Sequence, residues 1–164
     1  MEIIVLKGRE KSGKTTTTAL IHNLLLEKGF ECKKMNYDSS VNSEIQKIEI
    51  ENEVKDFSSE FEFENKKIHI FSEGDRKKYF NEHILPYSKK CNEVDVLVIC
   101  VRIDFKDKRW KYLLEDVVKE VFKDCNRKEF SPKYLNEYND KNEMIAAKKE
   151  TAAKIVDYIY EVIQ

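Results

Sequence analysis

The chain has 164 residues, enough to close one hydrophobic core, so we expect a single domain over residues 1–164. Its 30 lysines and arginines nearly balance its 31 aspartates and glutamates, which leaves a formal net charge of −1. Proteins that bind along a nucleic-acid backbone or on an anionic membrane usually carry a clear excess of positive charge. This chain has no such excess, so its charge gives no indication of either partner.

The first predicted element is a buried strand. Ile3 to Leu6 form a continuous apolar run of the kind found in strands covered on both faces. Because strand-like residues begin at Glu2, there is no space for a signal peptide, and no later apolar run approaches the roughly 20 residues that span a bilayer. We therefore expect a cytosolic protein without a membrane segment.

A helix and a second strand are predicted next. Apolar residues recur at helical spacing from Gly13 onward, and Gly29 is suited to end the helix. Phe30, Cys32 and Met35 then favour a strand, so that residues 2–37 would form a βαβ unit with Asp38 at its exit.

The middle of the chain contains a clear hairpin. Residues 39–56 show both a weak period of two and a weak helical period, and both readings stay open. Apolar residues then alternate through 61–63 and 68–71 around a turn at Asn65 and Lys66, which predicts an antiparallel hairpin. A helix is expected from Arg76 to His83 and slightly beyond, ending around Pro86.

The second half completes an α/β pattern. Val94–Val101 reads as a central strand, and apolar stripes over 110–122 and 144–163 predict two helices that cover the core. We therefore predict the α/β class, with a three-layer, mostly parallel sheet that carries one antiparallel hairpin.

The stretch GREKSGKT, Gly8 to Thr15, matches the phosphate-binding pattern G-x-x-x-x-G-K-[ST] between a predicted strand and a predicted helix. Two glycines let backbone N–H groups turn around an anion, and the helix N-terminus adds unpaired donors. Lys14 can reach the β- and γ-phosphates, and the Thr15 hydroxyl can ligate Mg²⁺. The predicted phosphate-binding residues of this loop are Gly8, Arg9, Glu10, Lys11, Ser12, Gly13, Lys14 and Thr15.

With this motif and its flanking elements, the chain resembles the P-loop NTPase superfamily, whose Walker A motif GREKSGKT matches. The resemblance covers residues 2 to about 38 and implies a nucleoside triphosphate, ATP or GTP, bound with Mg²⁺. It also implies that Thr16 contacts the α-phosphate side of the nucleotide. Arg9 stands where the ParA-like branch has its additional lysine.

Three places offer a carboxylate for the metal shell or for catalysis. Glu73 and Asp75 directly follow the returning strand of the hairpin and are the first candidates, for both metal binding and catalysis. Ser72 and Asp75 also fit a capping box at the start of the next helix, so a purely structural role stays open. Asp38 is the second metal candidate, and Asp104 is the third carboxylate.

Arg102 is the first candidate for a catalytic cation, together with Lys14, because it leaves the carboxyl end of an inner strand. Residues 102–110, RIDFKDKRW, are the only lid-like stretch. The guanine signature N-K-x-D is absent, since NDKN at 139–142 does not match it, and SEGD at 72–75 differs from the D-x-x-G of small GTPases. ATP is therefore the default nucleotide.

Three functions agree with these features. The leading prediction is a Mg²⁺-dependent ATP or GTP hydrolase. The alternatives are a small-molecule or nucleotide kinase and a non-catalytic module that binds nucleotide. A protein partner or a homodimer stays open, because the sequence indicates neither.

Overall fold

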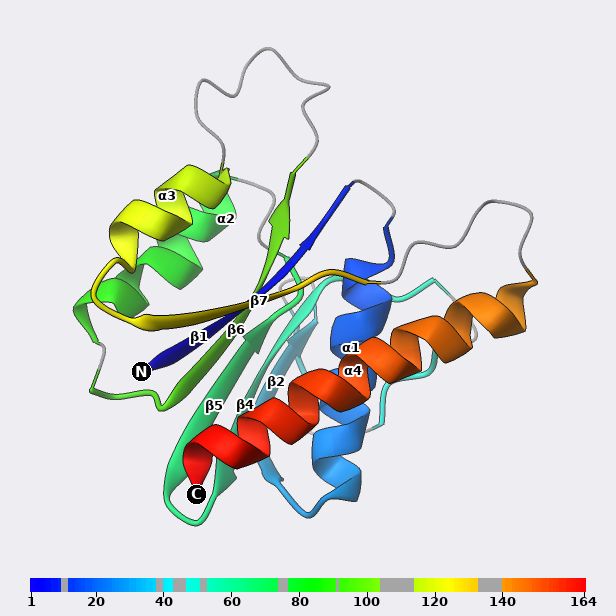
Figure 1. Cartoon of the computed structure of the whole chain (residues 1–164). Coiled ribbons are helices and arrows are strands. Elements are labelled where there is room, and N and C mark those ends of the chain that lie inside the picture. Colours follow the sequence, from blue (N-terminus) through cyan, green and yellow to red (C-terminus); the bar gives the residue numbers. More distant parts are fainter. Residues whose placement is uncertain are drawn as a thin grey trace.

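The structure, a computed structural model, describes residues 1–9, 12–37, 40–42, 47–50, 53–73, 77–90, 92–103, 114–132 and 140–164. Strands and helices alternate through most of this length (Figure 1). In chain order the elements are β1 (Glu2–Gly8), α1 (Lys14–Glu27), β2 (Glu31–Tyr37), β3 (Ser40–Asn42), β4 (Phe57–Phe63), β5 (Lys66–Phe71), α2 (Lys77–Tyr79), the π-helix η1 (Phe80–Ile84), the 3₁₀-helix η2 (Leu85–Lys89), β6 (Val96–Arg102), α3 (Leu114–Val121), β7 (Asn126–Phe130) and α4 (Lys141–Ile163).

One seven-stranded sheet in the order β3-β2-β4-β5-β6-β1-β7 organises the described chain. The part β5-β6-β1-β7 is parallel, and the pairings β5-β4, β4-β2 and β2-β3 are antiparallel. The α/β class and the hairpin are therefore confirmed. The prediction of a mostly parallel sheet needs correction, because the sheet is mixed and antiparallel pairing extends beyond the hairpin to β2 and β3.

The second strand joins the sheet far from the first. Three strands, β6, β5 and β4, lie between β1 and β2. The expected βαβ unit thus does not place its two strands side by side. Local periodicity predicted β2 correctly, but the pairing partner depends on β4 and β5, which come later in the chain.

The hairpin turn lies at Glu64 and Asn65, one residue earlier than predicted. Both residues have positive φ, 49° and 66°. Two successive positive φ values are those of a type I′ turn, whose twist suits the two flanking strands. This geometry brings the beginning of β4 to the same sheet edge as the end of β5, where Ser58 pairs with Phe71.

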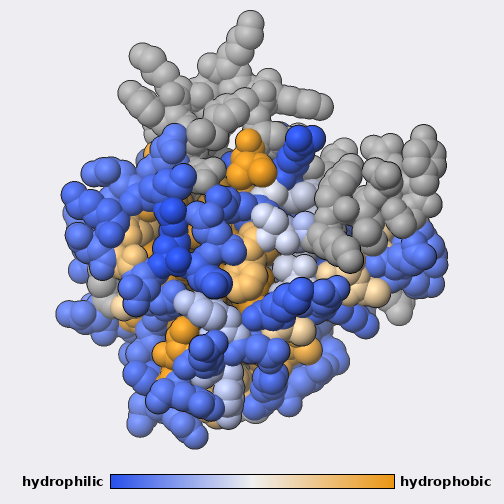
Figure 2. All heavy atoms as spheres, viewed as in Figure 1, coloured by the Kyte–Doolittle hydropathy of each residue, from blue (hydrophilic) through white to orange (hydrophobic). Residues whose placement is uncertain are grey.

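Helices cover both faces of the sheet, which confirms the expected layers. Ile4 and Leu6 of β1 belong to a core formed with α1 and α4. Ile3 and Val5 point to the opposite core, formed with the helices of 77–89 and with α3. Figure 1 shows α1 and α4 together on one side of the strands and α2 and α3 on the other. The face drawn in Figure 2 is largely hydrophilic, with hydrophobic residues in small separate areas.

Three details differ from the predicted elements. The helical segment after β5 continues through Pro86 to Lys89, because the proline stands in the first turn of η2, where no N–H donor is needed. Strand β7 was not predicted, since its sequence NRKEF is almost entirely polar. Residues 47–50 and 53–56 form neither helix nor strand, while β3 occupies 40–42.

Among the described residues, no helix is long and apolar enough to cross a membrane.

Candidate phosphate site

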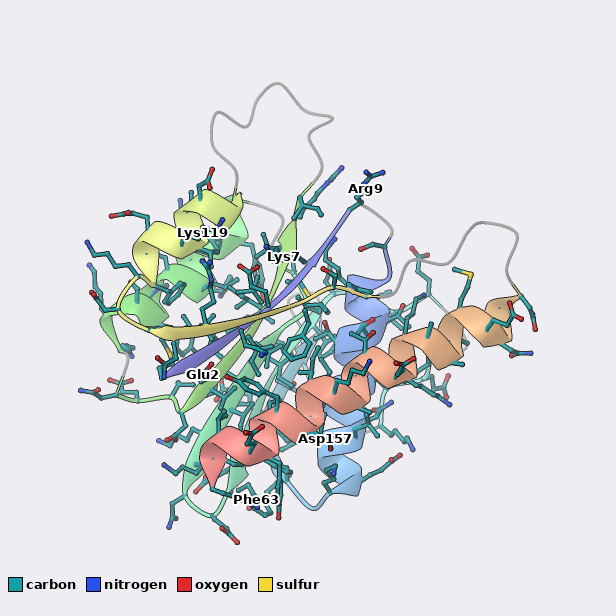
Figure 3. The ribbon with its side chains drawn as sticks, in the orientation of Figure 1. Glu2, Lys7, Arg9, Phe63, Lys119 and Asp157 are labelled. Carbon is teal, nitrogen blue, oxygen red and sulfur yellow. The ribbon has the colours of Figure 1, made fainter. Side chains whose placement is uncertain are left out.

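The segment between β1 and α1 carries the predicted phosphate loop, residues 8–15, of which the structure describes 8–9 and 12–15. A Cβ built on Gly8 would lie 2.1 Å from Ser12 Oγ, so the loop can close this tightly only over a glycine. Gly13 has φ +83°, the left-handed region that favours glycine. The amide of Ser12 donates to the Arg9 carbonyl over 3.2 Å. Figure 3 shows Arg9 at the end of β1, where the loop begins.

Lys14 lies inside this loop. Its side chain folds back, and Nζ donates hydrogen bonds to the carbonyl oxygens of Gly8, over 3.1 Å, and Arg9, over 2.8 Å. The residue is only 6% exposed. A buried ammonium is stable only where polar groups surround it, so the loop backbone fixes its position beside the N-terminus of α1.

Four threonines, Thr15 to Thr18, follow Lys14 in the first turns of α1. The hydroxyls of Thr17 and Thr18 donate to the carbonyls four residues earlier, those of Gly13 over 2.9 Å and Lys14 over 2.8 Å. Thr18 Oγ1 also lies 3.1 Å from Cys100 Sγ in β6. The buried contact of Thr18 with Cys100 fastens the beginning of the helix to β6. Thr16 lies in the same turn and is partly exposed.

Thr15 makes a different contact, with a residue that the sequence analysis did not single out. Its hydroxyl donates to Asp56 Oδ1 over 3.2 Å. Ser72 Oγ donates to the same oxygen over 3.4 Å and accepts the amide of Phe57 over 2.7 Å. We call Asp56, Ser72 and Glu73 the acidic corner. Asp56 belongs to it because β4 starts where β5 ends, a consequence of the hairpin that would have been readable from the predicted strands.

Glu73 and Arg102 lie at the same edge of the sheet as the loop. Glu73 follows β5 and is 7% exposed. Arg102 is the last residue of β6, directly opposite Gly8 in the register of β1 with β6. Strand β6 separates β5 from β1. Glu73 and Arg102, both predicted site residues, therefore lie at the same end of the sheet as Lys14, because the carboxyl ends of the parallel strands β5, β6 and β1 meet there.

Several predicted residues lie outside the described part of the chain. They are Glu10 and Lys11 of the loop, the carboxylates Asp38, Asp75 and Asp104, and most of the lid-like stretch at 104–110. Ser72 is described, and its hydroxyl is engaged with Asp56 and Phe57.

The described residues fit a magnesium ion. Mg²⁺ prefers oxygen ligands and in nucleotide sites usually takes one or two from the protein, with phosphates and water completing the shell. The Thr15 hydroxyl and the Asp56 carboxylate, in direct contact, are ligands of this type. No group of three or more His, Cys, Asp or Glu side chains that could hold a metal occurs among the described residues, and a site of this kind does not require one.

Comparison of the chain with protein-family models, with curated proteins and with solved structures gives no match.

Proposed function

We propose that this protein binds a nucleoside triphosphate with Mg²⁺ at the phosphate loop and hydrolyses it, with ATP as the default nucleotide. The observation that supports this most directly is the position of Lys14. Its ammonium is buried at the N-terminus of α1, inside a loop whose glycines permit close backbone approach. A buried cation beside a helix N-terminus, where the first N–H groups have no partner within the helix, suits a phosphate chain.

Each residue of the site has a role in this proposal. Lys14 balances the charge of the β- and γ-phosphates, and the backbone of residues 8–15 surrounds them. Thr15 and Asp56 would hold the ion, which when bound neutralises charge on the phosphates. Glu73 would orient the attacking water, and Arg102 would offset charge that develops on the γ-phosphate.

The Thr15–Asp56 contact supports a metal-dependent site rather than a simple anion site. A threonine hydroxyl that only caps a helix needs no carboxylate partner. Here the carboxylate comes from the start of β4, distant in sequence, and is held in place by Ser72. Two hydrogen bonds to one carboxylate oxygen fix its orientation toward Thr15.

The test is binding and turnover of ATP and GTP, with and without Mg²⁺, in the parent protein and in Lys14→Ala. Lys28→Ala is the matched control, since Lys28 stands at the far end of α1 and pairs with Asp157. We expect phosphate release by the parent and by Lys28→Ala, and loss of binding in Lys14→Ala. Transfer only to an added acceptor would identify a kinase, and tight binding without turnover a non-catalytic module. Equal binding by Lys14→Ala and the parent would refute the proposal.

A further inference from the structure

A second lysine reaches the phosphate loop from the opposite end of the chain. Lys148 of α4 places Cε 2.3 Å and Nζ 2.9 Å from the position that a Cβ on Gly13 would occupy. The end of its side chain therefore packs directly on the backbone of Gly13. No pattern in the loop itself could indicate this contact, which depends on how α4 crosses α1.

Lys148 occupies an unusual place on its helix. The face of α4 that packs on the core carries Thr151, Ala152, Ile155 and Ile159. Helical spacing of three and four residues continues this face back to Lys148. The core-facing stripe of α4 thus ends in a cation where it meets the beginning of α1.

The charge of Lys148 is poorly compensated. Partial burial lowers the pKa of its ammonium, and within the described part of the chain it forms no ion pair. By contrast, Lys154 on the same helix pairs with Glu150 over 2.7 Å. A half-buried ammonium without a counter-charge is unfavourable, and a ligand that supplied negative charge would relieve it.

The surroundings of Lys148 increase the positive potential further. The N-terminus of α1 is the positive end of its dipole, and its first turn holds no acidic residue. Lys14 adds another cation in the same loop. Beside them, Ser12 Oγ is a buried side-chain polar atom without a hydrogen-bond partner, the one such atom within the described ranges. Two lysines, a helix N-terminus and an unused hydroxyl are complementary to an anion of several charges.

We propose that Lys148 is a second phosphate-binding cation and that it contacts the polyphosphate chain of the ligand. In this way α4 would contribute a residue to the site. This inference rests on the function proposed above. It assigns to the last helix a direct part in ligand binding, in addition to its packing on the core. It also predicts that affinity increases with the number of phosphates, because charge rather than the base is recognised at this point.

The experiment is calorimetric titration with Mg-ATP and with inorganic tripolyphosphate, which has phosphates but neither sugar nor base. The variants are Lys148→Met, which keeps the length of the stem, Lys148→Arg, which keeps the charge, and the control Lys149→Met at an exposed neighbouring position. We expect Lys148→Met to weaken both ligands by about tenfold or more, as for loss of a charge-assisted hydrogen bond. Lys148→Arg, because it keeps the positive charge, and Lys149→Met, because its side chain is exposed, should stay within about threefold of the parent.

Thermal unfolding separates a binding role from a packing role. Without ligand, Lys148→Met should be at least as stable as the parent, because an uncompensated charge near the helix N-terminus is removed. Its stabilisation by tripolyphosphate should be smaller. Equal affinity of Lys148→Met and Lys149→Met, with binding lost in Lys14→Ala, would overturn this inference and leave the proposed function intact. Absence of binding in the parent itself would overturn both.

Discussion

The two glycines of positive φ provide a measurement of how tightly the phosphate loop is packed. Gly13 has φ +83° and Gly29 has φ +86°, so alanine is strained to a similar degree at both positions. The surroundings differ, because a Cβ at Gly29 meets nothing within 4 Å whereas one at Gly13 meets the end of Lys148. Gly29→Ala is therefore a matched control for Gly13→Ala.

The expected magnitudes follow from this difference. Gly29→Ala should lower the free energy of unfolding by about 1–2 kcal/mol, the cost of a left-handed conformation for a residue with a Cβ. Gly13→Ala should cost about 0.5 kcal/mol more, the low end of the cost of an off-rotamer side chain, because the flexible end of Lys148 has to shift. The double variant Gly13→Ala/Lys148→Ala should lose this additional cost.

Urea unfolding of the parent, Gly29→Ala, Gly13→Ala, Lys148→Ala and the double variant measures these values. Nucleotide titration of the folded variants complements them. Gly29→Ala should bind ATP like the parent, while Gly13→Ala should bind weakly, since the Cβ pushes Lys148 aside and disturbs the loop. Equal destabilisation by the two single substitutions, or no coupling between Gly13 and Lys148, would show that the contact between α4 and the loop is absent in solution.

Three further predictions address the acidic corner and the opposite face of the sheet. Asp56→Asn should reduce the gain in ATP affinity that Mg²⁺ provides while leaving Mg-free binding within about twofold, measured by paired titrations. Ser72→Ala should lower the free energy of unfolding by about 1–3 kcal/mol in urea, because the amide of Phe57 loses its 2.7 Å acceptor; an unchanged midpoint would contradict this. Burial raises the pKa of Tyr87 to about 12, above the unfolded value near 10. Between these two pH values the folded protein binds more protons than the unfolded one, so the free energy of unfolding should fall as pH rises from about 10 to 12. Tyr87→Phe should make this fall shallower, as followed by urea midpoints at about pH 9 and pH 11.

Much of the fold was predictable because its strongest signals are local. The apolar runs of β1 and β6 and the spacing of α4 follow directly from burial on one or two faces. The need for glycine between β1 and α1 was predictable for a similar reason, since Gly8 and Gly13 meet backbone requirements within a few residues.

What sequence reasoning missed depends on contacts between distant segments. The predicted hairpin implies that Asp56 lies near the end of β5, but its contact with Thr15 depends on how α1 packs beside that end of the sheet. Lys148 reaches Gly13 because of the crossing of two helices, which no periodicity reveals. The position of β2 was likewise decided by pairing with β4 rather than by its own sequence.

Strand β7 is an edge strand whose charged residues disfavour pairing with another molecule. As the last strand in the order β3-β2-β4-β5-β6-β1-β7, it presents one row of backbone groups without a neighbouring strand in the described sheet. Four of its five residues are exposed, among them Arg127 and Lys128, and charged side chains on such a border disfavour pairing with a second molecule. The polar sequence of β7, which made the strand hard to predict, thus disfavours aggregation. Replacing Arg127 and Lys128 with valine would favour strand pairing between molecules.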